Sequence, residues 1–368
     1  MRDSFAGALE RANNGDWSFS DLVTIVHTDD PNEEAALYRL AAAVRDRCCG
    51  RRLFVRGLVE FSNRCGNSCL YCGLNSRNTK VRRYSLSSGE ILDCAGRIAA
   101  AGIGTIVLQS GEDCCPAEWL AEIIKEIKAR WNLAVTLSVG ERPEADYRLW
   151  RQAGADRYLL RIESSDPLLY RSLHRGRELE SRIRCLSCLR EQGYQLGSGI
   201  MVGLPGQSAE TIAKDAEFFE HWDFDMIGIG PFIPHPDTEL HAEAAGGIGR
   251  TLNTIALTRI LLRNSLMPAT TALGSLEGDH RLQGLNAGAN VIMPNFTPDG
   301  RRSLYSIYPG KNCCNEFASG DKPGVQHADS SGASECRSDG AVGLAEKAGL
   351  SLDMGRGDSL KKKYQHIQ

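Results

Sequence analysis

Three cysteines spaced three and then two residues apart are the residues of this chain best placed to do chemistry. They stand in Cys65-Gly-Asn-Ser-Cys69-Leu-Tyr-Cys72, so one short loop can direct all three thiols at a single metal centre. A structural zinc site closes its tetrahedron with four protein ligands, whereas a catalytic metal site keeps one position open. Closely spaced cysteines also bind iron–sulfur clusters, normally through four thiolates. Three cysteines would leave one iron of a cuboidal cluster free for a small molecule.

Two other interpretations of the cysteine triplet stay open on spacing alone. A distant residue could complete a zinc site, or the thiols could simply be buried in a core. The flanking sequence favours the cluster, because residues 53–61 have the apolar pattern of a strand. The loop then leaves the carboxyl end of a strand, which is the catalytic face in barrel enzymes.

Apolar runs alternate with stretches of helical period between residues 53 and 295, such as residues 87–101 with their Ser87…Glu90 capping box. Strands buried on both faces read as nearly continuous apolar runs, and their alternation with helices indicates a parallel sheet. We therefore predict an α/β fold, a (β/α)8 TIM-type barrel, with an open sheet as the alternative if one or two strands are overcounted. The strands predicted are residues 53–61, 105–110, 134–139, 157–163, 197–202, 225–231, 268–273 and 290–295.

Composition predicts three parts of the chain. Residues 1–52 are expected to form helices that pack on the barrel, and residues 53–312 the barrel itself. Residues 313–368 are expected to be a C-terminal extension that is partly flexible, because residues 315–340 are rich in Ser, Gly, Asp and Ala. Residues 341–350 have the pattern of one short helix.

Composition, the amino terminus and cysteine usage predict a soluble, cytoplasmic protein, which we expect to be a monomer. The net charge is −3 over 368 residues, without the basic stripe of a nucleic-acid surface. The amino terminus has no apolar signal core, and no run reaches the length of a membrane span. The 13 cysteines are scattered and odd in number, which is typical of a reducing compartment. An exposed iron–sulfur cluster would also require anaerobic conditions.

The cysteine spacing, Tyr71 before the last cysteine and the position of the loop resemble the radical S-adenosylmethionine (SAM) enzymes. The resemblance implies that Cys65, Cys69 and Cys72 bind one 4Fe-4S cluster. It also implies that SAM chelates the open iron through its amino and carboxylate groups.

Polar residues at the ends of other predicted strands could bind SAM. Gly111 permits close approach of the backbone, and Ser110-Gly111-Glu112 resembles the Gly-Gly-Glu motif that binds the SAM amino group. Glu163 after the fourth strand and Arg182 on the next helix could bracket the methionine end, with a surface ion pair as the simpler interpretation. Met201, between two glycines, could form a ledge for adenine, or belong to an ordinary tight turn.

Longer segments resemble HydE, the radical SAM maturase of FeFe-hydrogenase. The similarity covers roughly residues 5–313; biotin synthase and methylornithine synthase share the cluster loop and barrel, but Gly230-Pro-Phe-Ile-Pro-His-Pro236 and Pro268-Ala-Thr-Thr271 are typical of HydE. The other segments that carry it are Phe61-Ser-Asn63, Leu70-Tyr-Cys-Gly-Leu74, Ile106-Val-Leu-Gln-Ser-Gly-Glu-Asp113, Ala153-Gly-Ala-Asp-Arg-Tyr-Leu-Leu-Arg161, Met201-Val-Gly-Leu-Pro-Gly-Gln207 and Ala289-Asn-Val-Ile-Met-Pro-Asn295.

The HydE resemblance implies a reaction and its partners. The reduced cluster cleaves SAM to a 5′-deoxyadenosyl radical, which acts on the sulfur of an iron–cysteine carbonyl/cyanide precursor supplied by a HydG-like maturase. A ferredoxin or flavodoxin is the implied electron donor, and a HydF-like scaffold a further partner. The substrate cavity is implied to include Arg56, Thr136, Arg161, Thr270, Thr271, Met293, Tyr305 and Tyr308.

Arg56 and Arg161 are expected to point into the barrel, on the first and fourth strands. A buried arginine without an anion is costly, and a bound carboxylate or cyanide-bearing iron complex would relieve that cost. The alternative is an internal ion pair with Glu60 or Glu163.

Some HydE proteins carry a second cluster near the carboxyl terminus, and this chain departs from that pattern. Cys313 keeps the first position, but Cys336-Arg-Ser-Asp339 has aspartate where a second cysteine is expected. We therefore predict no second cluster, although Cys313, Cys314 and Cys336 together could still bind something.

Two alternative functions stay open: a radical SAM mutase or sulfur-chemistry enzyme acting on a small amino acid, and a zinc-stabilised barrel without enzymatic activity.

Overall fold

Parallel strands form a closed ring at the centre of the molecule. The structure is a computed structural model that describes residues 1–112, 115–311 and 340–361. One six-stranded sheet follows chain order and contains β2 (Gly57–Ser62), β3 (Thr105–Ser110), β4 (Ala134–Ser138), β5 (Arg157–Leu159), β6 (Gln195–Val202) and β7 (Met226–Pro231). A second sheet pairs β1 (Arg52–Val55) with β8 (Val291–Ile292).

Three isolated parallel bridges complete the ring. Met226 bridges to Leu266, Pro268 to Val291, and Asn295 back to Leu58 on β2. Residues 266–268 therefore occupy the place of the seventh strand. This ring confirms the predicted (β/α)8 barrel and excludes the open sheet.

Alternate strand residues face the helices and the barrel axis. Ile106, Leu108, Val135 and Leu137 belong to the apolar core beneath the helices. Because neighbours along a strand point to opposite faces, residues between these positions face the axis. Among them are Gln109 and Thr136, so the interior of this barrel is partly polar.

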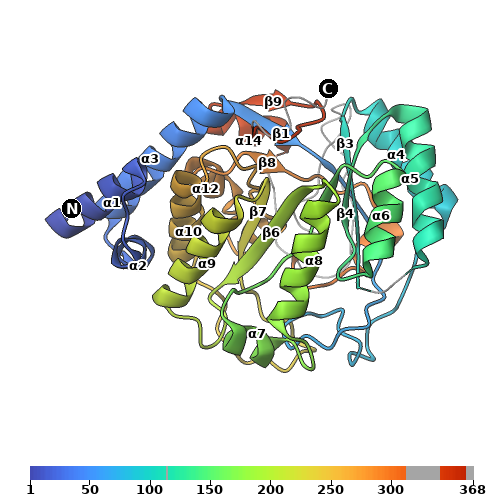
Figure 1. Ribbon diagram of the computed structural model, residues 1–368, viewed down its shortest axis with the longest axis horizontal. Helices are drawn as coiled ribbons and strands as arrows, with labels where there is room; N and C mark the ends of the chain where they lie inside the picture. The colour runs from blue at the N-terminus through green and yellow to red at the C-terminus, as the bar shows by residue number, and fades with distance from the viewer. Residues whose placement is uncertain (113–114, 312–339, 362–368) are drawn as a thin grey trace.

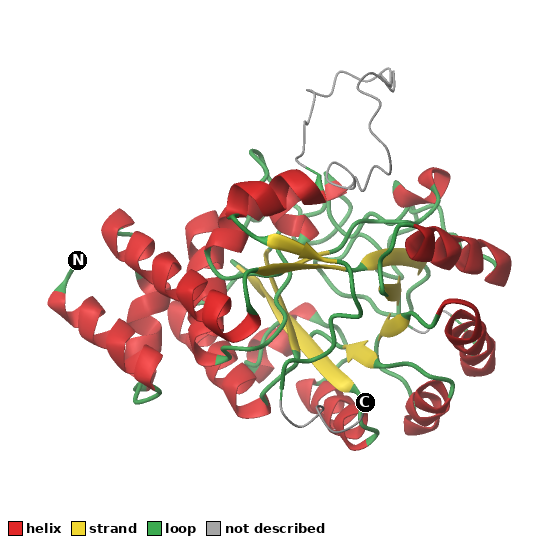
Figure 2. Cartoon of the chain, turned by 90° about the horizontal axis from the view of Figure 1, so that it is seen from above, coloured by secondary structure: helices red, strands yellow, loops and turns green. Residues whose placement is uncertain are grey.

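Helices surround the strands on the outside (Figures 1 and 2). Helix α4 begins at the predicted capping box, in which Ser87 and Glu90 satisfy each other's backbone N–H groups. The six main outer helices are α4 (Ser88–Ala100), α5 (Ala117–Trp131), α6 (Glu144–Gln152), α8 (Leu179–Glu191), α9 (Ala209–Trp222) and α10 (Ile248–Leu261). The shorter helices are α7 (Pro167–Leu173), α11 (Thr271–Ser275), α12 (Arg281–Asn286), α13 (Asp299–Arg302) and α14 (Ala341–Ala348).

The first three helices lie against one side of the barrel, at the left of Figure 1. They are α1 (Asp3–Asn14), α2 (Phe19–His27) and α3 (Pro31–Cys49), and they pack on α9 and α10. Asn253 of α10 joins them, because its Nδ2 donates to Thr28 O and its Oδ1 accepts from Tyr38 Oη at 2.7 Å. In the part of the chain that the structure describes, no helix has both the length and the apolarity needed to cross a membrane.

Three predicted strands differ in the structure. The strand predicted over residues 268–273 is wrong: Pro268 has no N–H to donate to a ladder, and α11 already begins at Thr271. The first predicted strand divides at Arg56 into β1 and β2. Strand β5 ends at Leu159, four residues before Glu163, which forms only an isolated bridge to Ile200.

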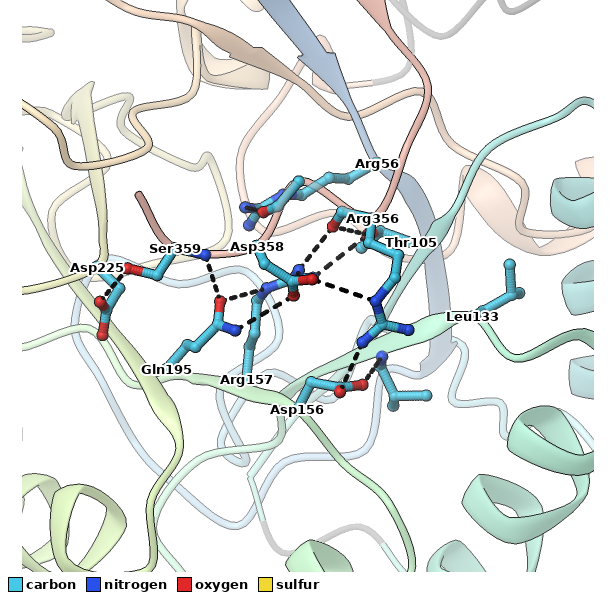
Figure 3. Close-up of polar contacts among 12 residues, drawn as sticks. Arg56, Thr105, Leu133, Asp156, Arg157, Gln195, Asp225, Arg356, Asp358 and Ser359 are labelled. Atoms are coloured by element: carbon cyan, nitrogen blue, oxygen red, sulfur yellow. Dashed lines mark hydrogen bonds and ion pairs between the residues drawn. The ribbon is translucent and has the colours of Figure 1, made fainter. Parts of the chain in front are cut away.

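A C-terminal strap, residues 354–361, crosses the amino-terminal ends of the strands. It follows α14, which confirms the helix predicted there, and β9 (Ser351–Asp353), which pairs with β1. Figure 3 shows Arg157 of β5 meeting the strap: its Nη2 lies 2.6 Å from both Arg356 O and Asp358 Oδ1. The strap therefore forms the floor of the barrel. The stretch predicted to be flexible falls almost wholly within residues 312–339, outside the described residues.

We expect Asp358→Asn to lower the free energy of unfolding by about 1–2 kcal/mol, because Arg157 is fully buried and would lose its carboxylate while keeping neutral acceptors. Urea unfolding measures the change. The control is Glu122→Gln, whose exposed pair with Lys125 should change stability by less than about 0.5 kcal/mol. Equal effects of the two substitutions would contradict the assignment of Asp358 to the floor.

Candidate active site

The cysteine loop lies at the carboxyl ends of the strands, between β2 and α4. Neighbouring elements bind its backbone: Gly66 N–H donates to Glu112 O, Leu70 N–H to Leu173 O and Gly73 N–H to Ile307 O, each at 3.0 Å. The Arg83 guanidinium donates to four further carbonyl groups, those of Asn63, Leu74, Asn75 and Asn78. The loop is therefore held on several sides at the mouth of the barrel.

Cys65, Cys69 and Cys72 are half-buried free thiols. Burial raises the pKa of Cys69 to about 12, and the neighbouring Cys65 contributes to that rise. The pKa values of Cys65 and Cys72 are also raised, again chiefly by burial. Thiols that influence one another in this way can become thiolate ligands together only if positive charge is bound beside them. A cationic iron cluster fits this donor set.

A zinc ion and a cuboidal iron–sulfur cluster make different demands on three thiol ligands. Within residues 1–112, 115–311 and 340–361, no three His, Cys, Asp or Glu side chains converge closely enough to hold one metal ion. A zinc ion would draw every thiolate sulfur to within about 2.3 Å of one point. In a cuboidal cluster each cysteine binds a different iron, so the sulfurs stand further apart.

Gly111 and Glu112, at the end of β3, lie directly against the loop. A Cβ at Gly111 would stand 2.0 Å from Arg64 O and 2.8 Å from Cys65 Cβ, so only glycine fits. Glu112 is 8% exposed, and its Oε1 is buried without a hydrogen-bond partner among the described residues. The ammonium group of a ligand would satisfy this oxygen. Ser110 instead donates its hydroxyl to Gly111 O.

Arg182 joins the site through different partners from those predicted. Its Nη2 lies 3.3 Å from Glu112 Oε2, its Nε donates to Glu141 Oε1 at 2.7 Å, and its Nη1 donates to Arg161 O. The structure thus brings Arg182 to Glu112 and Glu141, whereas Glu163 forms an ion pair with Arg161. Sequence analysis missed Glu141, although it follows the third predicted strand as Glu112 follows the second.

Glu163 forms a bidentate ion pair with Arg161. Nε and Nη2 of Arg161 each lie 2.9 Å from one Glu163 oxygen, and Nη2 also donates to Ile200 O. Burial alone would lower the pKa of Arg161, but Glu163 outweighs it and the pKa is raised. The internal ion pair considered as the alternative for Arg161 is therefore present.

Tyr71 is anchored by a neutral histidine. His174 Nδ1 lies 2.9 Å from Tyr170 O and must donate to it, so Nε2 accepts from the Tyr71 hydroxyl at 2.8 Å. Burial lowers the pKa of His174 to about 4, which keeps it neutral at pH 7. Met201 and Tyr71 share an apolar cluster with Phe232. The predicted ledge at Met201 thus adjoins the cysteine loop.

Some residues implied to line the substrate cavity gather near the mouth. Thr271 Oγ1 lies 2.6 Å from the Tyr308 hydroxyl, and Gln109 Nε2 donates to the Tyr305 hydroxyl. Thr270 packs over β7, where its Oγ1 lies 2.9 Å from the position of a Cβ on Gly230. Ile307, next to Tyr308 in the chain, accepts from Gly73 N–H, which joins this segment to the cysteine loop.

Other residues of that set lie deeper in the barrel. Thr136 is buried, and its Oγ1 has no hydrogen-bond partner among the described residues. Arg56 lies at the floor beside the C-terminal strap (Figure 3): Nη2 donates to Gly357 O, Nη1 lies 2.8 Å from Met226 Sδ, and Nε is buried without a partner in the described part of the chain. Met293 packs near this floor with Leu360.

The ion pair considered for Arg56 with Glu60 or Glu163 is wrong, because Glu60 pairs with Lys311. Lys311 was missed by the sequence analysis, since 251 residues separate the two partners. Its ammonium also lies 4.7 Å from the centre of the Tyr305 ring.

Comparison with known proteins agrees with this geometry. Residues 59–219 match the model of the radical SAM superfamily. The chain is 46% identical over 306 residues to the [FeFe] hydrogenase maturase subunit HydE of Thermotoga maritima, covering 83% of this chain and 88% of that protein. The crystal structure of methylornithine synthase superposes with a TM-score of 0.71 at 28% identity, covering 78% of this chain and 85% of that one. The FeFe-hydrogenase maturase HydG shares the fold, with a TM-score of 0.70 at 17% identity over 79% of this chain and 67% of that one.

A closed parallel barrel with a three-cysteine loop at its mouth, together with the family match, defines a radical SAM enzyme. This class implies a 4Fe-4S cluster and SAM as cofactors. Within it, the chain belongs to the HydE family of FeFe-hydrogenase maturases.

Gly111→Ala should displace the cysteine loop, because the added methyl group would overlap Arg64 O. We expect anaerobically reconstituted protein to hold less than about half the iron of the unmodified chain, since site geometry governs metal affinity. Gly89→Ala is the matched control: its Cβ would meet nothing closer than 4.0 Å, so iron content should not change. Full iron content in Gly111→Ala would contradict the close packing of β3 against the loop.

Proposed function

We propose that this protein binds one 4Fe-4S cluster through Cys65, Cys69 and Cys72, and uses SAM to process an iron-bound precursor of the FeFe-hydrogenase cofactor. The observation that carries the proposal is the meeting, at the mouth of a closed barrel, of three half-buried cysteines and Glu112 Oε1, which accepts no hydrogen bond in the part of the chain that the structure describes. Membership of the HydE family supports the choice of pathway. When bound, the cluster supplies the electron that cleaves SAM to methionine and a 5′-deoxyadenosyl radical.

The residues at the mouth would hold SAM by its two ends. Glu112 Oε1, which accepts no hydrogen bond within the described residues, would accept one from the SAM ammonium group, and Arg182 holds the Glu112 carboxylate in place. The flat adenine would lie on Met201 beside Tyr71, whose hydroxyl is immobilised by His174. The methionine carboxylate needs a cation. Arg177 is half-buried, with Nη2 3.7 Å from Glu112 Oε1. It is a better candidate than Arg182, because Arg182 already has three acceptors.

The barrel interior would hold the substrate away from water. Arg161, Thr270, Thr271 and Tyr308 supply hydrogen-bond donors below the mouth, and the strap closes the opposite end. We infer that they bind an iron–cysteine carbonyl/cyanide complex made by a HydG-like maturase, with Tyr305, Thr136 and Met293 shaping the wall. Charged guanidinium groups suit such an anionic ligand. Arg56 would act at the floor.

Further features belong to the same proposal. A ferredoxin or flavodoxin would supply the electron, and a HydF-like scaffold would receive the product. The protein would act as a cytoplasmic monomer, without nucleic acid or membrane, and would carry a single cluster. Cys313, Cys314 and Cys336 lie outside the described residues.

A second candidate is a mutase acting on a small amino acid. The superposition on methylornithine synthase favours it, because the cysteine loop and barrel would serve both reactions. Incubation with SAM and reductant separates the two: conversion of an iron–cysteine carbonyl complex supports the maturase, and rearrangement of a free amino acid supports the mutase.

Cys69→Ala should abolish reductive SAM cleavage, because it removes one of three ligands. We expect about four irons and four sulfides per chain in the anaerobic wild type, and markedly less iron in the variant. The control is Cys188→Ala, a half-buried thiol on α8, which should retain both iron and SAM cleavage. One zinc and no iron in the wild type, or full SAM cleavage by Cys69→Ala, would refute the proposal.

A further inference from the structure

Asp215 of α9 is a fully buried carboxyl group behind the site. It forms no ion pair within the described residues, and its exposure is 0%. Its Oδ1 accepts from the Ser165 N–H at 2.5 Å and the Ser165 hydroxyl at 2.6 Å, with the Ser164 hydroxyl at 3.5 Å. Its Oδ2 has no hydrogen-bond partner in the same residues. A buried carboxyl group without a cation costs free energy that only such hydrogen bonds offset.

The turn that Asp215 holds is strained. Ser164 N–H donates to Ile162 O at 2.8 Å, which closes a three-residue γ-turn centred on Glu163. Glu163 has a φ of +60°, which identifies the rarer and less stable form of this turn. A residue other than glycine keeps such a conformation only where its surroundings fix it. On one side of the turn, Glu163 N–H donates to Gly199 O and Glu163 O accepts from Met201 N–H at 3.3 Å. On the other side, Asp215 binds Ser165.

The strained turn decides where the Glu163 carboxylate points. It returns the side chain toward Arg161, two residues earlier, for the bidentate pair at 2.9 Å. With an ordinary negative φ, the carboxylate would leave the strand in a different direction. The direction of Glu163 therefore depends on the anchoring of Ser165.

We propose that Asp215 is a positioning residue that, through Ser164 and Ser165, holds Glu163 against Arg161. Because Glu163 is one of the residues expected to contact SAM, Asp215 would thereby influence SAM affinity. The inference rests on the proposed function. Asp215 itself stands behind the turn on α9. Burial raises its pKa to about 7 in spite of the Ser165 donors, in keeping with a carboxyl group that lacks a counter-ion.

A double-mutant cycle between Asp215 and Glu163 tests the proposal, with SAM affinity measured on the anaerobic, cluster-loaded protein. Asp215→Leu keeps the size but removes the acceptor, and should raise the SAM Kd about tenfold. Asp215→Asn retains one carbonyl oxygen in place of Oδ1 and should bind SAM within about twofold of the wild type. In a Glu163→Gln background, Asp215→Leu should cause no further loss, because Asp215 acts through Glu163.

Amide hydrogen exchange gives a second readout that needs neither cluster nor SAM. The Ser165 amide should exchange much faster in Asp215→Leu than in the wild type, and at a near wild-type rate in Asp215→Asn. If Asp215→Leu does not fold, Ser165→Ala can replace it, because it removes the Ser165 hydroxyl and keeps the Ser165 N–H as a donor to Asp215. It should weaken SAM binding and speed amide exchange to a smaller degree. Asp21→Leu, at another buried carboxyl in the N-terminal helices, is the control and should leave both readouts unchanged.

The outcomes separate the two proposals. Equal loss of SAM affinity from Asp215→Leu with and without Glu163→Gln, or an unchanged Ser165 exchange rate, would overturn the positioning role. Failure of the cluster-loaded wild type to bind SAM would overturn the proposed function itself.

Discussion

Holding three thiolates together in a half-buried loop is the physical constraint on which the rest of this structure depends. Burial opposes ionisation of Cys65, Cys69 and Cys72, and neighbouring thiols raise the pKa values of Cys69 and Cys72 further. Under the proposed function, the loop would therefore become a ligand only when iron compensates the charge. The loop must also have the correct conformation before the metal binds. The hydrogen bonds of Arg83 and the close packing at Gly111 hold the loop rigid. Metal binding would then not have to supply free energy to order the loop.

The barrel around this loop encloses its polar interior at both ends. At the mouth, Gly73 N–H donates to Ile307 O, so the segment beside Tyr305 and Tyr308 is joined to the cysteine loop. At the floor, the strap supplies Asp358 to Arg157. A reaction that proceeds through a radical needs exclusion of water and of side reactions. The two closures serve that need, while Arg161 and the threonines keep the interior polar.

Local sequence patterns predicted the parts of the site that depend on local structure. The cysteine spacing, and the carboxylates Glu112 and Glu163 after their strands, could be read directly because a parallel barrel gathers strand ends at one face. The capping box of α4 was also evident, since its two partners are three residues apart.

Contacts between distant segments decided the rest. Arg56 reaches Gly357, which lies 301 residues away, so its position at the floor could not be predicted without the strap. The pairing of Glu60 with Lys311 could not be predicted for the same reason, because 251 residues separate the two side chains. The seventh strand was predicted too far along the chain for a different reason. Residues 268–273 are apolar enough for a strand, but the chain forms only two bridges, at Leu266 and Pro268, before α11 begins at Thr271. In Glu163, tertiary contacts override local preference and impose a positive φ.

Electron paramagnetic resonance of the reduced, anaerobic protein, recorded before and after SAM is added, tests the central claim most directly. The account predicts the signal of one reduced 4Fe-4S cluster whose g values shift when SAM binds, because SAM takes the iron that no cysteine occupies. A cluster signal that SAM leaves unchanged, or the absence of any cluster signal, would contradict it.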